Sequence, residues 1–132
     1  MGKHILRLLT KAVKEKQCAA VRYRDQRQIR VIEPHCIYTN ERDEMVVDGY
    51  QVRGYSSGGR PPPFWRPLRL KKITALSILK ETFDTRWAEG FDPNKKKYQK
   101  KIVAIVTKKK PNTIVYPTQQ QQEMGPFLPD KR

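Results

Sequence analysis

The chain of 132 residues is long enough for one domain of ordinary size, and its hydrophobic content of 37% is low but still typical of a globular protein. Its 28 Lys and Arg residues against 13 Asp and Glu give a formal net charge of +15. This charge favours a polyanionic partner, and nucleic acid is favoured over an anionic membrane surface. The alternative is that the basic side chains only make the surface soluble. No apolar run approaches the length of a membrane span and the N-terminus lacks a secretory h-region, so we expect a soluble cytoplasmic protein whose cysteines, Cys18 and Cys36, are free thiols.

A helix is expected at the N-terminus, followed at once by strands. Residues 4–16 place apolar side chains at helical spacing with basic ones on the other side, which predicts an amphipathic helix of about three turns. Residues 19–24 then alternate as a half-buried strand does, and a polar turn leads to a second alternating stretch at 29–32. Pro34 interrupts this stretch, so residues 35–39 are expected to form a short continuation or a bent third strand.

Further strands are expected across the middle of the chain. Residues 39–44 predict a charged turn, and residues 45–55 predict the next strand, in which Gly49 marks a bulge or a close approach of the backbone. After a loop rich in Gly and Pro, residues 64–70 predict another strand. Residues 73–83 fit both a helix and a strand, and the pattern leaves the two open.

One helix followed by about five short strands predicts a mainly β (α+β) fold, in which the helix packs on a small, strongly bent five-stranded β-barrel. We place this domain at residues 1–92. Residues 93–132 are expected to hold a basic linker, a β-hairpin at about 100–118 and a disordered tail that contains Gln and Pro. The first region carries 18 basic and 11 acidic side chains and the second 10 and 2, so each region is expected to be basic on its own.

The order of four short motifs resembles the WYL domain of bacterial regulators. VRYR (21–24), RVIEPHCIY (30–38), MVVDGY (45–50) and RPLRLKKI (66–73) correspond to the family's strand ending in Tyr, its strand with Arg and a following Pro, its Trp-Tyr-Leu strand and its Arg-rich strand. The match spans about residues 5 to 83. The resemblance implies an Sm-like β-barrel that senses a ligand, in several members a nucleic acid or a nucleotide-derived one, and a role in transcription regulation.

Two departures from the family pattern bear on function. The triad that names the family is replaced by Met45-Val46-Val47. Most members sit behind a DNA-binding winged helix, and none can fit ahead of residue 5. We therefore expect a stand-alone module that acts through another chain or has a different role.

Basic and aromatic side chains of the expected barrel form the candidate binding site. In the resembling family the Arg-rich strand contributes to the ligand surface, and the matching positions are Arg66, Arg69 and Lys72. An arginine fork suits phosphate or carboxylate, and nearby aromatic rings can stack on bases. Alternation points Arg66 and Arg69 to opposite faces of the strand, so the two side chains cannot both reach one ligand. The alternative to a ligand-binding role is that these side chains are solvated at a strand edge. The full set of candidates for binding a ligand or nucleic acid is Arg66, Arg69, Lys72, Trp65, Tyr50, Arg30, His35 and Tyr23.

Some of these candidates have a structural alternative. Core packing is the alternative for Tyr23, whereas Trp65 beside the prolines is expected to be exposed. Non-specific contacts with a phosphate backbone are expected from the lysines of the C-terminal region, for which a solvated linker and hairpin tip are the alternative. These lysines are Lys95, Lys96, Lys97, Lys108, Lys109 and Lys110.

Catalysis finds little support in the sequence. His35 and Cys36 are adjacent, so they point in opposite directions along a strand and are badly placed for proton transfer. His35 has two remaining interpretations, a ligand contact and a partly buried, hydrogen-bonded side chain. No carboxylate cluster suggests a metal site, and we expect no catalytic residue, metal or cofactor.

The leading interpretation is a non-enzymatic, ligand-sensing regulatory module that binds nucleic acid or a nucleotide-like anion through the barrel. The alternative is a protein–protein interaction module. It would form a homodimer or dock on a separate regulator or effector through the C-terminal hairpin, whose apolar residues 102–107 expose a strand edge if unpaired.

Overall fold

A computed structural model describes residues 2–56 and 58–106 of the chain. One helix, α1 (Gly2–Glu15), precedes a six-stranded antiparallel sheet, so the expected mainly β, α+β fold is confirmed. The strands are β1 (Gln17–Tyr23), β2 (Ile29–Thr39), β3 (Met45–Gly54), β4 (Phe64–Arg69), β5 (Ile73–Thr82) and β6 (Ile102–Ile105), with two short 3-10 helices, η1 (Leu70–Lys72) and η2 (Lys96–Tyr98). Over these two ranges, the structure has no helix with the length and apolar character that a bilayer crossing requires.

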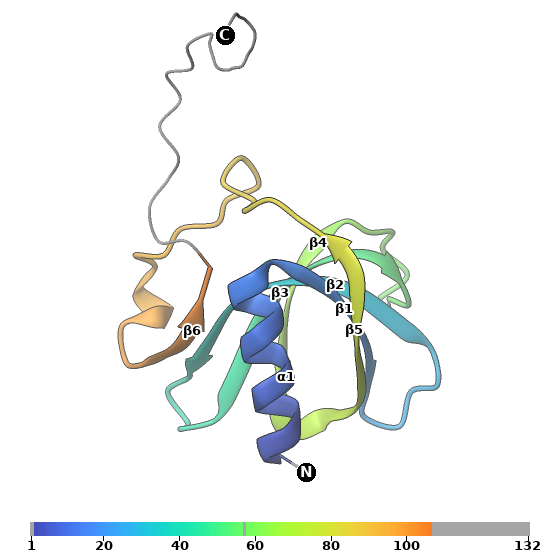
Figure 1. The fold of residues 1–132 in the computed structure, drawn as a ribbon, viewed down its shortest axis with the longest axis horizontal. Coiled ribbons are helices and arrows are strands. Elements are labelled where there is room, and N and C mark those ends of the chain that lie inside the picture. The colour runs from blue at the N-terminus through green and yellow to red at the C-terminus, as the bar shows by residue number, and fades with distance from the viewer. Residues whose placement is uncertain (1, 57, 107–132) are drawn as a thin grey trace, which may run out of the picture.

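The sheet is strongly curved but does not close. Its strands follow the order β4-β3-β2-β1-β5, with β6 paired to β2, and Figure 1 shows α1 lying in front of the curved sheet. The expected closed barrel is not formed, because η1 interrupts the extended backbone between β4 and β5 and no ladder joins these two strands in the part of the chain that the structure describes. Two single hydrogen bonds instead join the end of β1 to β4 and η1. Arg24 N donates to Lys72 O at 2.7 Å, and Arg69 N donates to Tyr23 Oη at 3.0 Å.

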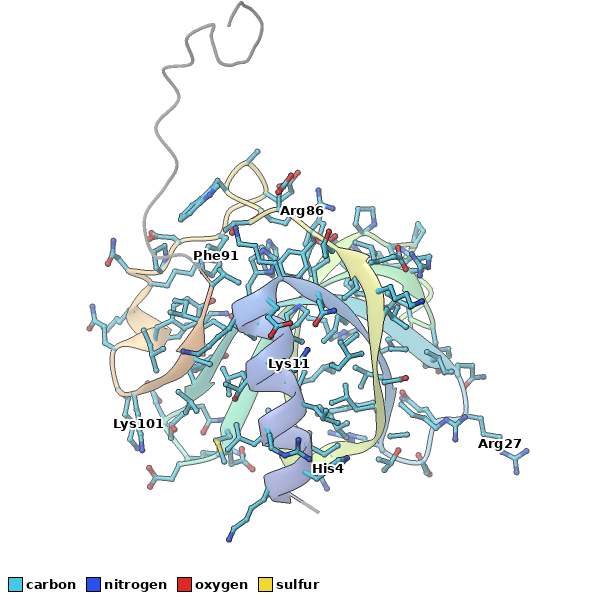
Figure 2. The ribbon with its side chains drawn as sticks, in the orientation of Figure 1. His4, Lys11, Arg27, Arg86, Phe91 and Lys101 are labelled. Atoms are coloured by element: carbon cyan, nitrogen blue, oxygen red, sulfur yellow. The ribbon has the colours of Figure 1, made fainter. Side chains whose placement is uncertain are left out.

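Helix α1 confirms the amphipathic pattern of the N-terminus. Its buried side chains lie four, seven and eight residues after the first, so they form one stripe that packs on β1, β2 and β5. Burying each of the larger ones contributes about 1.5–3 kcal/mol. They are Ile5, Leu9, Ala12 and Val13. The opposite side is basic and exposed, and Figure 2 shows Lys11 on the outer side of the helix.

Strand β2 is one continuous strand rather than two. Its pairing with β1 ends at Ile32 and its pairing with β6 begins at Cys36, so Pro34 falls in the gap between the two ladders, which fits a residue that has no N–H to donate. The register with β3 shifts between Pro34 and Cys36, which leaves His35 as the extra residue of a bulge. Opposite Pro34 lies Gly49, where an added Cβ would approach Ile32 Cδ1 to 2.8 Å. The close approach expected at Gly49 is confirmed.

Strand β5 settles the choice between helix and strand for residues 73–83. The segment is extended and pairs with β1 over most of its length, so its alternating pattern, and not its helical spacing, corresponds to the structure. The edge of β1 left open by β2 supplies the hydrogen-bond partners that a strand needs. Tertiary pairing therefore decides an element whose local pattern is ambiguous.

Residues 83–106 cover the outer face of β2, β3 and β4. Phe91 and Tyr98 are buried in this covering segment, and β6 pairs with Cys36–Tyr38 of β2. The expected linker and first hairpin strand thus pack against the sheet. Residues 113–118, predicted to form the second strand of the hairpin, lie outside the described residues.

Candidate nucleic-acid interface: an arginine pocket

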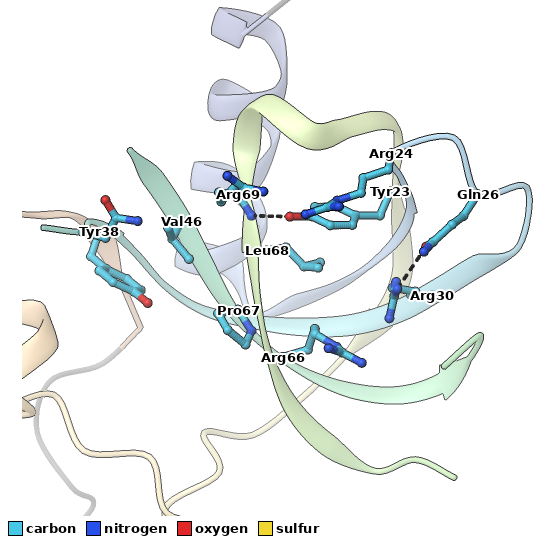
Figure 3. Close-up of a pocket in the computed structure, with 11 residues that line it drawn as sticks. Tyr23, Arg24, Gln26, Arg30, Tyr38, Val46, Arg66, Pro67, Leu68 and Arg69 are labelled. Atoms are coloured by element: carbon cyan, nitrogen blue, oxygen red, sulfur yellow. Dashed lines mark hydrogen bonds between the residues drawn. The ribbon is translucent and has the colours of Figure 1, made fainter. Parts of the chain in front are cut away.

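A surface hollow of about 520 Å³ lies between β4 and the turn that joins β1 to β2. These segments are not paired with each other, and the curvature of the sheet brings them together. The volume falls in the range of small-molecule binding sites. The lining residues, shown in Figure 3, are Tyr23, Arg24, Gln26, Arg30, Tyr38, Asn40, Val46, Arg66, Pro67, Leu68 and Arg69. We call this hollow the arginine pocket.

Arg30 is the most buried cation of the arginine pocket, with only 3% of its surface exposed. Its guanidinium donates to Gln51 Oε1 and Tyr55 O, both at 3.3 Å, and to Gln26 Oε1 at 3.0 Å. All three acceptors are neutral, and the buried Nε–H has no acceptor. Burial lowers the pKa of Arg30, and the nearby positive charge of Arg66 lowers it further. Among residues 2–56 and 58–106, this desolvated charge therefore has no opposite charge beside it.

Arg66 is the second cation without a compensating charge. It lies on β4 beside Gly49 of β3, and its guanidinium carbon is 5.3 Å from the centre of the Phe64 ring. Its Nε is also buried and has no hydrogen-bond acceptor. Figure 3 shows the side chains of Arg30 and Arg66 in the same part of the pocket. None of the residues that line the pocket is acidic.

Arg69 differs because it has a counter-ion. Its Nη1 lies 3.4 Å from Glu44 Oε2, and Lys71 Nζ lies 2.9 Å from the same oxygen. The hydrogen bonds from Lys71 and Asn40 lower the pKa of Glu44 to about 2, so this carboxylate stays ionised. Arg69 therefore adds less net positive charge to the pocket than Arg30 or Arg66.

The tyrosine rings near the pocket are engaged by arginines. The guanidinium of Arg30 lies 5.9 Å from the ring centre of Tyr23 and 5.5 Å from that of Tyr55, and Arg24 lies 5.6 Å from Tyr23. Such contacts stabilise buried guanidinium groups. They leave the pocket with a cationic surface suited to an oxyanion rather than with open rings for stacking bases.

The structure brings half of the predicted binding residues into one place. Tyr23, Arg30, Arg66 and Arg69 all line the arginine pocket, although alternation had separated Arg66 from Arg69. Lys72 lies next to the pocket, where its carbonyl accepts a hydrogen bond from Arg24 N, but its side chain does not line it.

The other three predicted residues belong to an aromatic cluster under the covering segment. Trp65 was expected to be exposed, but it is half-buried. Its indole N–H donates to Glu89 O at 2.8 Å, and its ring packs on His35 and Tyr50. Tyr50 is buried, with the guanidinium of Arg86 4.8 Å from its ring centre. None of these residues lines the arginine pocket.

His35 is fully buried in this aromatic cluster as a neutral side chain. Its Nδ1 lies 2.8 Å from Glu33 O, and its Nε2 lies 3.0 Å from Arg86 N. The backbone N–H of Arg86 must donate, so Nε2 accepts and the proton is on Nδ1. Burial lowers the pKa of His35 to about 4. The geometry matches the second interpretation of His35, a hydrogen-bonded core residue.

The predicted phosphate-binding lysines are spread over the C-terminal region. Lys97 Nζ lies 2.6 Å from the buried carboxylate of Asp48, which also accepts a hydrogen bond from Tyr98 Oη at 2.6 Å. Lys95 and Lys97 line a separate cavity of about 100 Å³. Lys96 lies in η2. Lys108, Lys109 and Lys110 lie outside the described residues.

Sequence reasoning missed several polar residues of the pocket, which are Arg24, Gln26, Tyr38 and Asn40. Arg24 belongs to the VRYR motif, but alternation placed it opposite Tyr23. In the structure Arg24 has a positive φ of 59° at the end of β1, which breaks the alternation. Within residues 2–56 and 58–106, no three side chains of the types that bind metals come together.

Comparison with known protein families, with curated proteins and with solved structures finds no match to this chain. The resemblance to the WYL domain therefore stays a prediction.

Proposed function

We propose that the protein is a non-enzymatic binding module that holds a nucleic acid or a nucleotide-like anion in the arginine pocket. The observation that carries this proposal is the pair of neighbouring guanidinium groups, of the buried Arg30 and the half-buried Arg66, with no carboxylate among the lining residues. Buried charges are normally paired, and an unpaired one costs free energy. A bound oxyanion would supply the missing negative charge.

The most reactive side-chain types among the described residues support binding over catalysis. Burial raises the pKa of the Cys18 thiol to about 11, which disfavours the nucleophilic thiolate. Both ring nitrogens of His35 are occupied by backbone groups, so this histidine has no free position for proton transfer to a substrate.

We propose further that the open, curved sheet corresponds to the Sm-like fold of the WYL domain, although it does not close into a barrel. The strand order β4-β3-β2-β1-β5 and the two hydrogen bonds that join the end of β1 to β4 and η1 support this proposal. By this resemblance the protein would act as a regulatory ligand sensor in the cytoplasm.

Binding of labelled single-stranded DNA and RNA, measured by fluorescence polarisation over a range of salt concentrations, tests the proposed function. If Arg24, Arg30 and Arg66 together neutralise about three phosphate charges, the logarithm of the binding constant should fall with the logarithm of the salt concentration with a slope of about −2. An absence of binding at low salt would contradict the proposal. Binding that does not respond to salt would contradict it equally.

The C-terminal lysines offer a different location for the same activity. Replacing Arg66 with Gln should weaken binding more than replacing Lys108, Lys109 and Lys110 together with Gln, because Arg66 lies in a partly desolvated pocket where each charge interacts more strongly. The reverse ranking would place the interaction on the C-terminal region.

A second candidate function is docking of another chain on β6. In the described part of the chain, β6 pairs with β2 along one edge and with no strand along the other. An unpaired edge can accept a strand from a second copy or from a regulatory partner. Light scattering tests the homodimer. A mass that stays that of one chain at all concentrations would exclude it.

A further inference from the structure

The arrangement of charge in the arginine pocket bears on which kind of phosphate it accepts. Arg30 and Arg66 form its cationic floor, and Arg24 and Arg69 lie farther along the hollow. The only carboxylate that contacts any of these four arginines in the described ranges is Glu44, which is bound to Arg69 and Lys71. The floor therefore carries two positive charges, and its other polar neighbours, Gln26 and Gln51, are neutral.

Phosphate groups differ in the charge that they bring. A phosphodiester, as in the interior of a nucleic acid strand or in a cyclic nucleotide, has one negative charge. A phosphate monoester, as at the end of a strand or in a mononucleotide, has a charge of about −1.5 to −2 at pH 7, because its second pKa is about 6. It also has three terminal oxygens rather than two, so it can accept side-on from two guanidinium groups at once.

We infer that the arginine pocket is specific for a phosphate monoester, the terminal phosphate of a nucleic acid strand or of a mononucleotide, seated between Arg30 and Arg66. This inference rests on the proposed function and deepens it. Two adjacent cations, the buried Arg30 and the half-buried Arg66, are neutralised by one dianion, whereas a single phosphodiester leaves one of them unpaired. The tyrosine faces nearest the floor are occupied by guanidinium groups, so recognition depends on the phosphate and not on the base.

The test compares ligands that differ only at the phosphate. A labelled single-stranded oligonucleotide with a 5′-phosphate, one with a 3′-phosphate and one with hydroxyl groups at both ends are measured side by side, together with adenosine monophosphate against its 3′,5′-cyclic form. We expect a monoester to bind about tenfold more tightly than its matched diester or hydroxyl ligand, the gain of about one charge-assisted hydrogen bond. A preference seen with the mononucleotide assigns the ligand to that class, and a preference confined to oligonucleotides assigns it to strand ends.

The pH dependence supplies a second signature. Affinity for the monoester should rise as the pH increases from 5 to 7 and then level off, because the ligand gains its second charge near pH 6. The ionisable side chains that line the pocket or contact its arginines are arginines, tyrosines and Glu44, and no histidine lines it, so the hydroxyl-terminated ligand should show no such rise. An equal rise for both ligands would overturn the inference.

The variant Arg66→Gln should abolish the preference for the monoester, while Arg7→Gln, on the exposed side of α1, should keep it. Arg30→Lys serves as a second variant, because it keeps the buried positive charge but loses the planar guanidinium group that can donate two parallel hydrogen bonds. Equal binding of phosphorylated and hydroxyl-terminated oligonucleotides by the wild type would overturn this inference and leave the proposed function standing. No binding of either would overturn both.

Discussion

At the scale of single residues, the buried polar side chains fall into two kinds. His35 has both ring nitrogens engaged by backbone groups, so its surroundings fix one neutral tautomer. Arg30 is nearly as buried, but within the described part of the chain its Nε–H has no acceptor and its charge has no counter-ion. The first kind stabilises the fold. The second costs stability, and such a cost is typical of a site that awaits a ligand.

The protonation of His35 should make stability depend on pH. Its pKa is about 4 in the folded protein and 6.5 in an unfolded chain, so between these values the unfolded state binds more protons. The free energy of unfolding should therefore decrease as the pH falls from 7 to 4, by about 3 kcal/mol at most. Urea denaturation at several pH values measures this. In His35→Asn the decrease should largely disappear, and an unchanged decrease would contradict the assignment.

The close approach at Gly49 should make this position intolerant of a side chain. An alanine there would place Cβ 2.8 Å from Ile32 Cδ1 and 2.9 Å from Ile32 Cβ, which the adjacent strand cannot easily relieve. We expect Gly49→Ala to destabilise the protein by about 1–3 kcal/mol. Gly58→Ala is the matched control, because an added Cβ there meets no atom within 4 Å. Similar midpoints of chemical denaturation for the two variants would show that the contact is harmless.

At the scale of elements, the covering segment 83–106 is attached to the sheet by polar contacts as well as by aromatic packing. Arg86 binds the two carboxylate oxygens of Glu33 at 2.8 and 3.0 Å, and Lys97 and Tyr98 both reach Asp48. Because Glu33 and Asp48 are buried on β2 and β3, each needs its partner from the covering segment. The sheet and the segment should therefore unfold together.

Removing Arg86 should cost more than removing an equivalent surface arginine. Arg86→Gln leaves the buried Glu33 carboxylate without its partner, for which we expect a loss of about 2–4 kcal/mol, reduced from a fully buried case because Arg86 is one-third exposed. Arg53 makes the same bidentate contact with Glu81 in an exposed setting, so Arg53→Gln should cost much less. Equal losses in thermal or chemical denaturation would contradict a special role for the buried pair.

The elements also show what the sequence can and cannot predict. The sequence predicts α1 well, because its apolar side chains form one stripe, and it also predicts β1 and β3, although β3 is buried on both faces. The continuity of β2 through Pro34 depends on where its neighbours stop pairing, and the strand identity of β5 depends on the free edge of β1. The arginine pocket is harder still to predict from the sequence. Its arginines come from the turn after β1, from β2 and from β4, which the curvature of the sheet brings together, so alternation within one strand cannot group them.

At the scale of the whole molecule, the basic side chains behind the net charge of +15 fall into two groups, those exposed on the surface and those in the arginine pocket. Many of the basic side chains are solvated, such as Arg27, which projects from the turn between β1 and β2 in Figure 2. These exposed charges attract any polyanion and raise association rates. Only the arginine pocket combines burial, adjacent guanidinium groups and unused N–H donors in the described ranges. We therefore propose that the exposed charges provide long-range attraction and that the arginine pocket provides recognition.

The affinity of one labelled single-stranded oligonucleotide, measured at the same salt concentration for the wild type, Arg66→Gln and Arg7→Gln, tests this division most directly. The two variants lose the same formal charge, one from the pocket and one from the outer side of α1. We predict that Arg66→Gln weakens binding about tenfold or more and that Arg7→Gln changes it less than about twofold. Equal weakening by both variants would mean that only overall charge matters, and would contradict the assignment of recognition to the arginine pocket.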